Sequence, residues 1–177
     1  SGILMSPHFL FRIETHSEAN NAQEIQPVSH YELATRLSYF IWSSMPDDQL
    51  FSLASAGKLS DPAVLRQQVK RMLADDRSQA LVDNFASQWL NLRNLENIKP
   101  DPDQFDFFND QLRNDMKRET ELFFAAVMRE DRSVLDFVTG RFSFLNERLA
   151  KHYGIKGVTG DKFRKVSLQD YPRAGVL

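Results

Sequence analysis

Apolar residues recur three or four positions apart along most of the chain, which is the spacing of one face of an α-helix. These runs lie between residues 29 and 153 and are separated by proline, glycine or paired aspartates. Ser29 followed by Glu32 predicts a capping box at the first helix. Ser60 or Asp61 predicts the start of a later one. The pattern predicts an all-α fold, an irregular bundle of about five to seven helices.

Two of the predicted helices have clear apolar faces. The longest is expected from about residue 106 or 109 to Arg129. An earlier helix has a predicted buried face with spacings of four, four and three, formed by Leu81, Phe85, Trp89 and Leu92. Trp42 and Trp89 both lie among apolar neighbours, so we interpret them as core residues rather than as a platform for a sugar ring.

The C-terminal part changes character after a last short helix. Asn146 predicts the N-cap of that helix, which runs through His152 and ends at Gly154. The alternation in residues 163–168 fits a strand or an extended tail, so the fold is expected to end in a short extended arm. The predicted organisation is an apolar segment 1–16, a polar loop 17–28, a helical domain 29–153 and a C-terminal arm 154–177 that begins a following domain.

Composition and charge exclude several classes of function. The 22 basic and 24 acidic residues are interspersed and give a net charge of −2, so no basic stripe is present to bind nucleic acid. No apolar run is long enough to span a membrane. The chain has no cysteine, which excludes disulfides, cysteine-ligated metals and covalent haem attachment within it. The absence of cysteine leaves the compartment open.

His152 is the first candidate for chemistry. Near the C-terminus of a helix, a histidine gains from the helix dipole, so we interpret it as a residue that finishes the helix. The alternative is the substrate-side part of an oxidoreductase or hydrolase active site, in which His152 or His8 works with a carboxylate such as Glu119. No HxxxH or HExxH pattern is present, so we predict no metal site.

Glu119 is the carboxylate nearest the apolar face of the longest helix. Glu121 lies two positions on, about 200° around a helix, so the two cannot act together on one substrate. We interpret Glu119 as part of an ion pair, with Arg36 or Arg148 as the partner, or as a solvated residue.

A third hypothesis is a module that binds a polysaccharide through exposed aromatic rings. Phe105, Phe107 and Phe108 lie on a loop flanked by proline and could form such a surface, or they could pack on the longest helix as a hydrophobic staple. Tyr153 and Asn146 are the remaining candidates for binding residues.

Several long runs resemble one family in the same order along the chain. They are SPHFLFRIE, YELATRLSYFIWSSMPDDQL, KRMLADDRSQALVDNFASQWL, RETELFFAAVMREDRSVLDFV and FSFLNERLAKHYGIKGVTGDKFRKV. The family is the domain of unknown function found in large planctomycete-type proteins that also carry a c-type cytochrome module. The resemblance covers about residues 5 to 177. The matching positions Asn146, Glu147, Arg148, His152 and Tyr153 have no established role in that family.

The resemblance implies a context rather than a reaction. The parent protein is expected to be extracytoplasmic, in the periplasm or at the cell surface. This domain is expected to hold no cofactor, and a haem c of the parent would bind elsewhere. Its expected partners are other domains of the same chain. A domain of this kind is expected to expose an apolar surface, which could also support an oligomer. Residues 3–13, Val176 and Leu177 are predicted to contribute to that surface.

Overall fold

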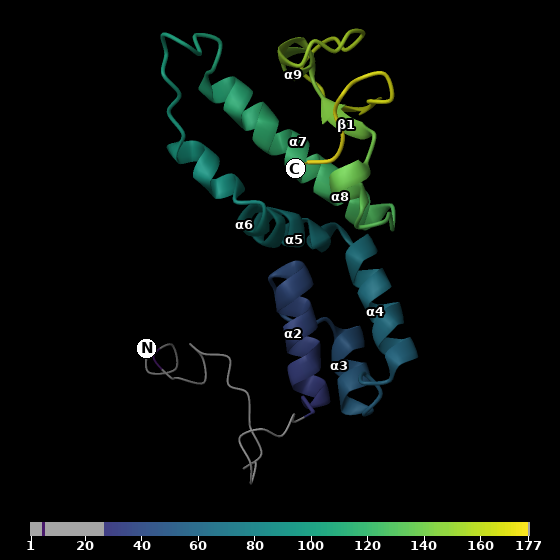
Figure 1. Cartoon of the computed structure of the whole chain (residues 1–177). Coiled ribbons are helices and arrows are strands. Elements are labelled where there is room, and N and C mark those ends of the chain that lie inside the picture. Colours follow the sequence, from purple (N-terminus) through teal and green to yellow (C-terminus); the bar gives the residue numbers. More distant parts are fainter. Residues whose placement is uncertain (1–4, 6–26, 177) are drawn as a thin grey trace. The chain divides into compact units, whose positions relative to one another are not determined.

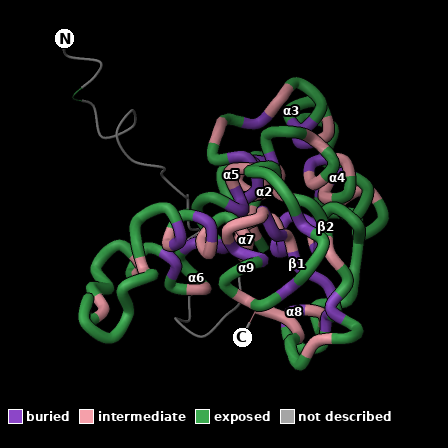
Figure 2. The backbone as a smooth tube through the Cα atoms, turned by 90° about the horizontal axis from the view of Figure 1, so that it is seen from above, coloured by how far each residue is buried: buried purple, intermediate pink, exposed green. Residues whose placement is uncertain are grey.

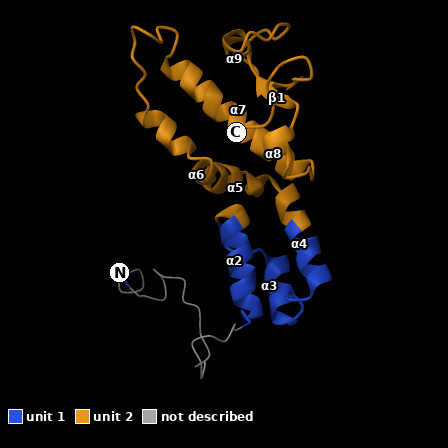
Figure 3. Cartoon of the chain, viewed as in Figure 1, with its two compact units in different colours: residues 1–40, 44–69 blue, residues 41–43, 70–177 orange. Residues whose placement is uncertain are grey.

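The computed structural model describes residue 5 and residues 27–176 (Figure 1). They are mostly helical, with one small two-stranded sheet, so the prediction of an all-α fold is confirmed. The chain divides into two compact units, which Figure 3 distinguishes by colour. Within the described residues, unit 1 holds residues 27–40 and 44–69, and unit 2 holds residues 41–43 and 70–176.

Unit 1 is built from helices whose ends follow the predicted capping signals. The helices are α2 (His30–Trp42), whose last two residues belong to unit 2, α3 (Asp48–Ser55) and the first part of α4 (Pro62–Ala74). Ser29 and Glu32 form the predicted capping box, because each side chain accepts a hydrogen bond from the other residue's backbone N–H. The Asp61 side chain accepts from the N–H groups of residues 63 and 64. Leu50 and Leu59 are fully buried in this unit.

Unit 2 has the longest helix as its central element. This helix is α7 (Asp110–Arg129). The elements between α4 and α7 are η2 (Asp76–Ser78), α5 (Gln79–Leu81), the π-helix η3 (Val82–Ala86), α6 (Ser87–Trp89) and η4 (Leu92–Asn97). After α7 come α8 (Asp136–Thr139), β1 (Phe142–Leu145), α9 (Glu147–His152) and β2 (Arg164–Ser167). The Asn109 side chain caps α7 by accepting from Leu112 N–H, so the start and the end predicted for the longest helix are both confirmed.

The two strands of unit 2 come from distant parts of the chain. β1 pairs with β2 in antiparallel register, from Phe142 opposite Ser167 to Leu145 opposite Arg164. The backbone N–H of Leu168 then donates to the carbonyl of Arg141. β1 packs along α7 and is largely buried, whereas α7 is buried mainly along residues 123–127 (Figure 2). The extended segment predicted at residues 163–168 is therefore one half of a sheet.

Two apolar clusters form the core of unit 2. The first surrounds Phe123, which is fully buried and stacks on Phe142 with ring centroids 4.4 Å apart. The second surrounds Leu149 and joins Leu112 and Leu145 to residues beyond α9, including Ile155. Trp42 is also buried, and its indole N–H donates to the carbonyl of Met72 at 3.0 Å, so the interpretation of Trp42 as a core residue is confirmed.

The helix predicted to carry Leu81, Phe85, Trp89 and Leu92 differs from its prediction. The segment contains the π-helix η3, and it ends at Asn91, whose φ of 55° is left-handed. A π turn takes one residue more than an α turn, so Phe85 and Trp89, which stack on each other, are rotated away from the buried face of Leu81. Phe85 and Trp89 are 40% and 56% exposed, so the interpretation of Trp89 as a core residue is wrong.

Candidate functional site

A carboxylate with two hydroxyl partners lies on α7 in unit 2. Glu119 is partly buried there. The hydroxyl of Ser143 on β1 donates to its Oε1. The hydroxyl of Tyr153, just after α9, donates to its Oε2 at 2.8 Å. Two elements from the C-terminal part of the chain thus meet α7 at one side chain.

The local sequence fixes the position of each partner. Ser143 is the second residue of β1 and is 4% exposed, so the strand turns this hydroxyl inward. Tyr153 is the C-cap of α9, and Gly154 follows it with a φ of 70°, the left-handed value that ends a helix. The buried amide of Asn146 begins the same helix by accepting from Leu149 N–H at 2.9 Å. Both predicted ends of α9 are confirmed.

Burial controls the protonation of the two titratable groups in this cluster. Desolvation raises the pKa of Glu119, against the lowering effect of the hydrogen bonds from Ser143 and Tyr153 and of the nearby charge of Arg173. Burial and the neighbouring Glu119 carboxylate raise the pKa of Tyr153, so its phenol stays a hydrogen-bond donor at neutral pH. The guanidinium carbon of Arg173 lies 3.8 Å from the centroid of the Tyr153 ring.

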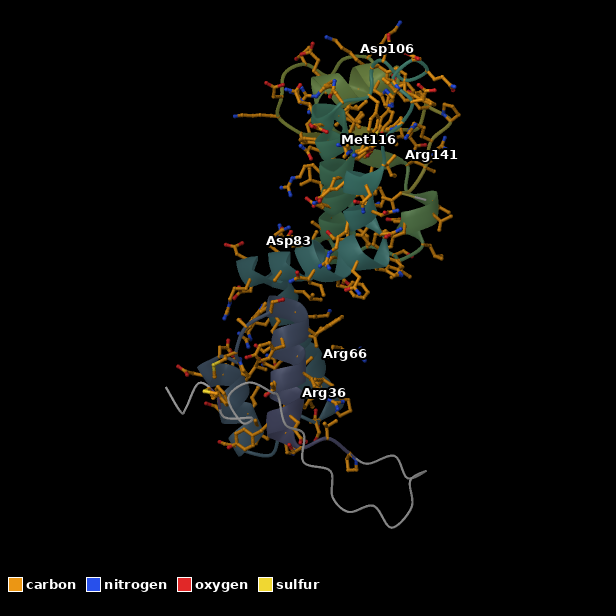
Figure 4. The ribbon with its side chains drawn as sticks, turned by 90° about the vertical axis from the view of Figure 1, so that its left-hand side faces the viewer. Arg36, Arg66, Asp83, Asp106, Met116 and Arg141 are labelled. Atoms are coloured by element: carbon orange, nitrogen blue, oxygen red, sulfur yellow. The ribbon has the colours of Figure 1, made fainter. Side chains whose placement is uncertain are left out.

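The cluster forms part of the wall of a cavity of about 630 Å³ within unit 2. Met116, also on the wall, lies on α7 in Figure 4. The polar lining consists of Asn91, Asn94, Glu119, Thr120, Ser143, Tyr153 and Arg173, and the apolar lining includes Leu90, Leu95, Ile98, Leu168 and Val176. Chemically, the arrangement offers hydrogen-bond acceptors and donors together with a desolvated carboxylate that can hold or release a proton.

The structure separates the histidine candidates from this carboxylate. His152 is exposed, does not line the cavity, and makes no hydrogen bond with any described residue. Its ring lies 5.3 Å from that of Phe107, measured between centroids. His8 lies outside the described residues. Among the described residues, no histidine makes a hydrogen bond with Glu119.

The prediction of an ion pair between Glu119 and Arg36 or Arg148 is wrong. Arg148 instead donates to Asp115 at 2.5 Å, and Glu119 makes its hydrogen bonds with hydroxyls rather than with an arginine. Glu121 pairs with Arg118 at 3.1 Å, so the two glutamates do act separately. Helical spacing placed Glu119 at the edge of the apolar face, but it could not show which strand would lie against it.

The remaining candidates have different surroundings. Asn146 is 1% exposed and serves as a helix cap. Phe107 is 50% exposed, whereas Phe108 is partly buried against the second core cluster. Tyr153 alone among the predicted binding residues lines the cavity together with Glu119. Sequence reasoning missed Ser143 and Arg173, although Ser143 is a polar position between two phenylalanines.

Exposed apolar side chains gather in a second region of unit 2, which we name the α6–α8 surface. Phe85 and Trp89 stack with ring centroids 5.9 Å apart. The Trp89 ring also meets that of buried Phe137 edge-on at 5.6 Å, which links it to the α8 region. In and just before α8, the exposed side chains of this surface are Val134, Leu135 and Val138, with exposed fractions of 75%, 67% and 57%.

The segments that the sequence predicts to form an apolar surface do not contribute to the α6–α8 surface as far as the structure describes them. Residues 3–13 lie outside the described residues, except for Met5, which is 77% exposed. Val176 packs against the first core cluster, and its N–H donates to the carbonyl of Phe137 at 2.9 Å. Leu177 is outside the described residues.

The described residues contain neither a cluster of metal ligands nor a membrane-spanning helix. No group of three or more His, Asp or Glu side chains among them is placed to hold a metal ion. None of the helices in the described part of the chain has both the length and the apolar character needed to cross a bilayer.

Replacing Glu119 with glutamine is expected to change how stability depends on pH. Because burial raises the pKa of Glu119 in the folded chain, the folded state binds more protons than the unfolded state just above the ordinary value of 4.5. The free energy of unfolding therefore loses a contribution as the pH rises through that window, and Glu119→Gln should not show this loss. Urea unfolding of both proteins at a series of pH values gives the free energy of unfolding. An identical pH dependence in the wild type and in Glu119→Gln would contradict a raised pKa of Glu119.

Comparison with known proteins gives a family and no characterised relative. Residues 28–155 match the family PSD4, described as a protein of unknown function (DUF1592). No curated protein and no solved structure matches the chain. The family match covers α2 to α9 and so includes Glu119, Ser143 and Tyr153. Since it spans well over half of the sequence, the chain belongs to the PSD4 (DUF1592) family of proteins of unknown function.

Proposed function

We propose that this chain is a non-catalytic interaction module of a larger extracytoplasmic protein that carries its haem in another domain. The α6–α8 surface is the observation that carries this proposal. The resemblance to planctomycete-type proteins with a c-type cytochrome module supports the context. In this proposal the domain itself holds no cofactor, and its role is to dock against a neighbouring domain of the parent.

The α6–α8 surface has the composition of a docking site. Exposed tryptophan and phenylalanine side chains dominate the binding energy of many protein interfaces. Trp89 and Phe85 lie stacked on this surface instead of within the core. Polar groups flank them, since Arg129 donates to Gln79 and Gln79 donates to Asp83. An apolar centre with a polar rim is the usual anatomy of an interface.

The proposed occupant is the c-type cytochrome module of the same parent chain. An interface between tethered domains does not need a large area, because the linker keeps the two partners at a high effective concentration. A small aromatic patch is therefore sufficient, whereas a stable dimer between separate chains needs about 800 Å² on each partner. The patch of five exposed apolar side chains fits the tethered case better.

A pair of matched variants tests the docking surface. Trp89→Ala is expected to weaken binding of the separately produced cytochrome module by about tenfold or more, because the largest exposed ring of the surface is removed. The module is titrated up to millimolar concentration, which matches the effective concentration that a short linker gives in the parent. Phe107→Ala is the control, since Phe107 is similarly exposed, at 50% against 56%, and is not part of this surface. Isothermal titration calorimetry gives both affinities, and the far-ultraviolet circular dichroism of each variant checks its fold.

A second variant guards against a local change of structure at Trp89, whose ring also meets Phe124. Val138→Asp puts a charge on α8, at a residue 57% exposed, and should weaken binding similarly. Equal binding by the wild type and both surface variants would refute the proposal. Concentration-dependent dimerisation that Trp89→Ala abolishes would assign the surface to a second copy of the chain instead.

A further inference from the structure

We propose that the cavity beside α7 binds a neutral, hydroxyl-rich small molecule of monosaccharide or disaccharide size, with Glu119 as its principal acceptor. This goes beyond the docking role, which uses a different surface and does not depend on the cavity. The size of the cavity, the free acceptor positions of Glu119 and the charges in the lining each favour this class of ligand.

The cavity has the size and construction of a ligand site. Its volume of about 630 Å³ lies within the range of about 300–1,000 Å³ that is typical of small-molecule pockets. Its walls come from η4, α7, β1 and residues 172–176, all within unit 2. Residues 172–176 are fixed to the segment between α8 and β1, since Gly175 N–H donates to the carbonyl of Gly140 at 2.8 Å.

Glu119 has unused capacity to accept hydrogen bonds. An ionised carboxylate offers about four lone-pair positions. The hydroxyls of Ser143 and Tyr153 take one on each oxygen, and no other described residue donates to it. The remaining positions suit a ligand that brings donors, and two adjacent hydroxyls of a sugar match the two oxygens of one carboxylate. Because Ser143 and Tyr153 fix its orientation, the carboxylate is preorganised for this contact.

Other polar groups in the lining can serve the same ligand. The side chain of Asn91 makes no hydrogen bond with the described residues, so its amide donor and acceptor are both available. Asn94 uses its Oδ1 to accept from Asn97 at 3.3 Å and keeps its amide N–H groups. An amide pairs with a hydroxyl in either direction, which suits a polyol.

The charges in the cavity favour a neutral ligand. An anion would meet the carboxylate of Glu119 in a partly desolvated site, where like charges repel strongly. A cation would meet the guanidinium of Arg173, which lies over the Tyr153 ring on the same wall. A neutral polyol avoids both repulsions, and Arg173 can still donate to one of its oxygens.

The apolar part of the lining completes the match. Leu95, Ile98 and Met116 form part of the lining. A sugar ring presents C–H groups between its hydroxyls, and these can pack against aliphatic side chains. A mixed lining of this kind suits an amphipathic neutral molecule better than a purely apolar one.

Saturation-transfer NMR and calorimetry with a panel of neutral sugars test the inference on the full chain. The panel contains glucose, galactose, N-acetylglucosamine and their disaccharides, beside a primary amine, a carboxylate and an uncharged dipeptide amide. We expect binding of at least one sugar. We expect Glu119→Gln to weaken it by about tenfold, because glutamine replaces one acceptor oxygen with a donor. Glu121→Gln is the control, since Glu121 does not line the cavity.

The possible results separate clearly. Sugar binding that Glu119→Gln weakens and Glu121→Gln leaves unchanged supports the inference. Absence of sugar binding, or equal binding by both variants and the wild type, overturns it. Stronger binding of the amine, the carboxylate or the dipeptide amide than of any sugar also overturns it. Asn91→Ala provides a second variant on an exposed residue, and it should weaken the same sugar if Glu119→Gln perturbs the fold.

Discussion

Phe123→Ala is expected to lower the free energy of unfolding of unit 2 by about 3–5 kcal/mol. Phe123 is fully buried in the first core cluster. Its ring stacks on Phe142 of β1 and also contacts Phe137 of α8, so truncation removes the packing between α7 and both elements. Urea unfolding followed by tryptophan fluorescence measures the effect. Both tryptophans of the chain, Trp42 and Trp89, belong to unit 2.

The control for this prediction is the same truncation at a surface ring. Phe107→Ala should change the free energy of unfolding by only about 0.5 kcal/mol, because half of that side chain already contacts water. A loss of less than about 1 kcal/mol for Phe123→Ala would mean that the α7–β1 packing is not the core of unit 2.

Asn146→Ala is expected to cost about 2 kcal/mol, near the upper end of the range for a helix cap. The Asn146 side chain is 1% exposed and satisfies the N–H of Leu149, which alanine would leave buried without a partner. Thermal unfolding followed by circular dichroism measures the loss.

A conservative variant separates this structural role from a binding role. Asn146→Ser keeps an acceptor near the same place without burying a charge and should retain most of the stability. Unchanged stability of Asn146→Ala, together with a loss of ligand or partner binding, would instead identify Asn146 as a binding residue.

Helix boundaries were predictable because they depend on residues close together in the sequence. The capping box of Ser29 and Glu32 and the caps at Asn109 and Asn146 lie within three residues of the groups they satisfy. Capping chemistry of this range can be read without a fold. The extended segment at residues 163–168 was also predicted, but its pairing with β1 was not, because that depends on contacts across some twenty residues.

The position of Trp89 shows where periodicity misleads. Its spacing from Leu81 and Phe85 indicated one buried face, but the π-helix η3 changes the number of residues per turn. Nothing in single-residue preferences marks a π turn. The large exposed rings that result are the basis of the α6–α8 surface.

The candidate site could be predicted only in part. Glu119 and Tyr153 were selected from the sequence, and the structure joins them through a hydrogen bond of 2.8 Å. Ser143 and Arg173 complete the cluster from positions 24 and 54 residues beyond Glu119, and no local rule brings them together. His152, the most conspicuous candidate in the sequence, lies outside the cavity because it finishes α9 on its exposed side.

Hydrogen–deuterium exchange on the chain alone and within the parent protein tests the docking claim most directly. We expect amides of residues 82–89 and 133–139 to exchange more slowly in the parent, since the α6–α8 surface would be covered there. The loop at residues 99–107 serves as an internal reference and should exchange equally in both. Equal exchange of the α6–α8 surface in the two proteins would show that no domain of the parent docks on it.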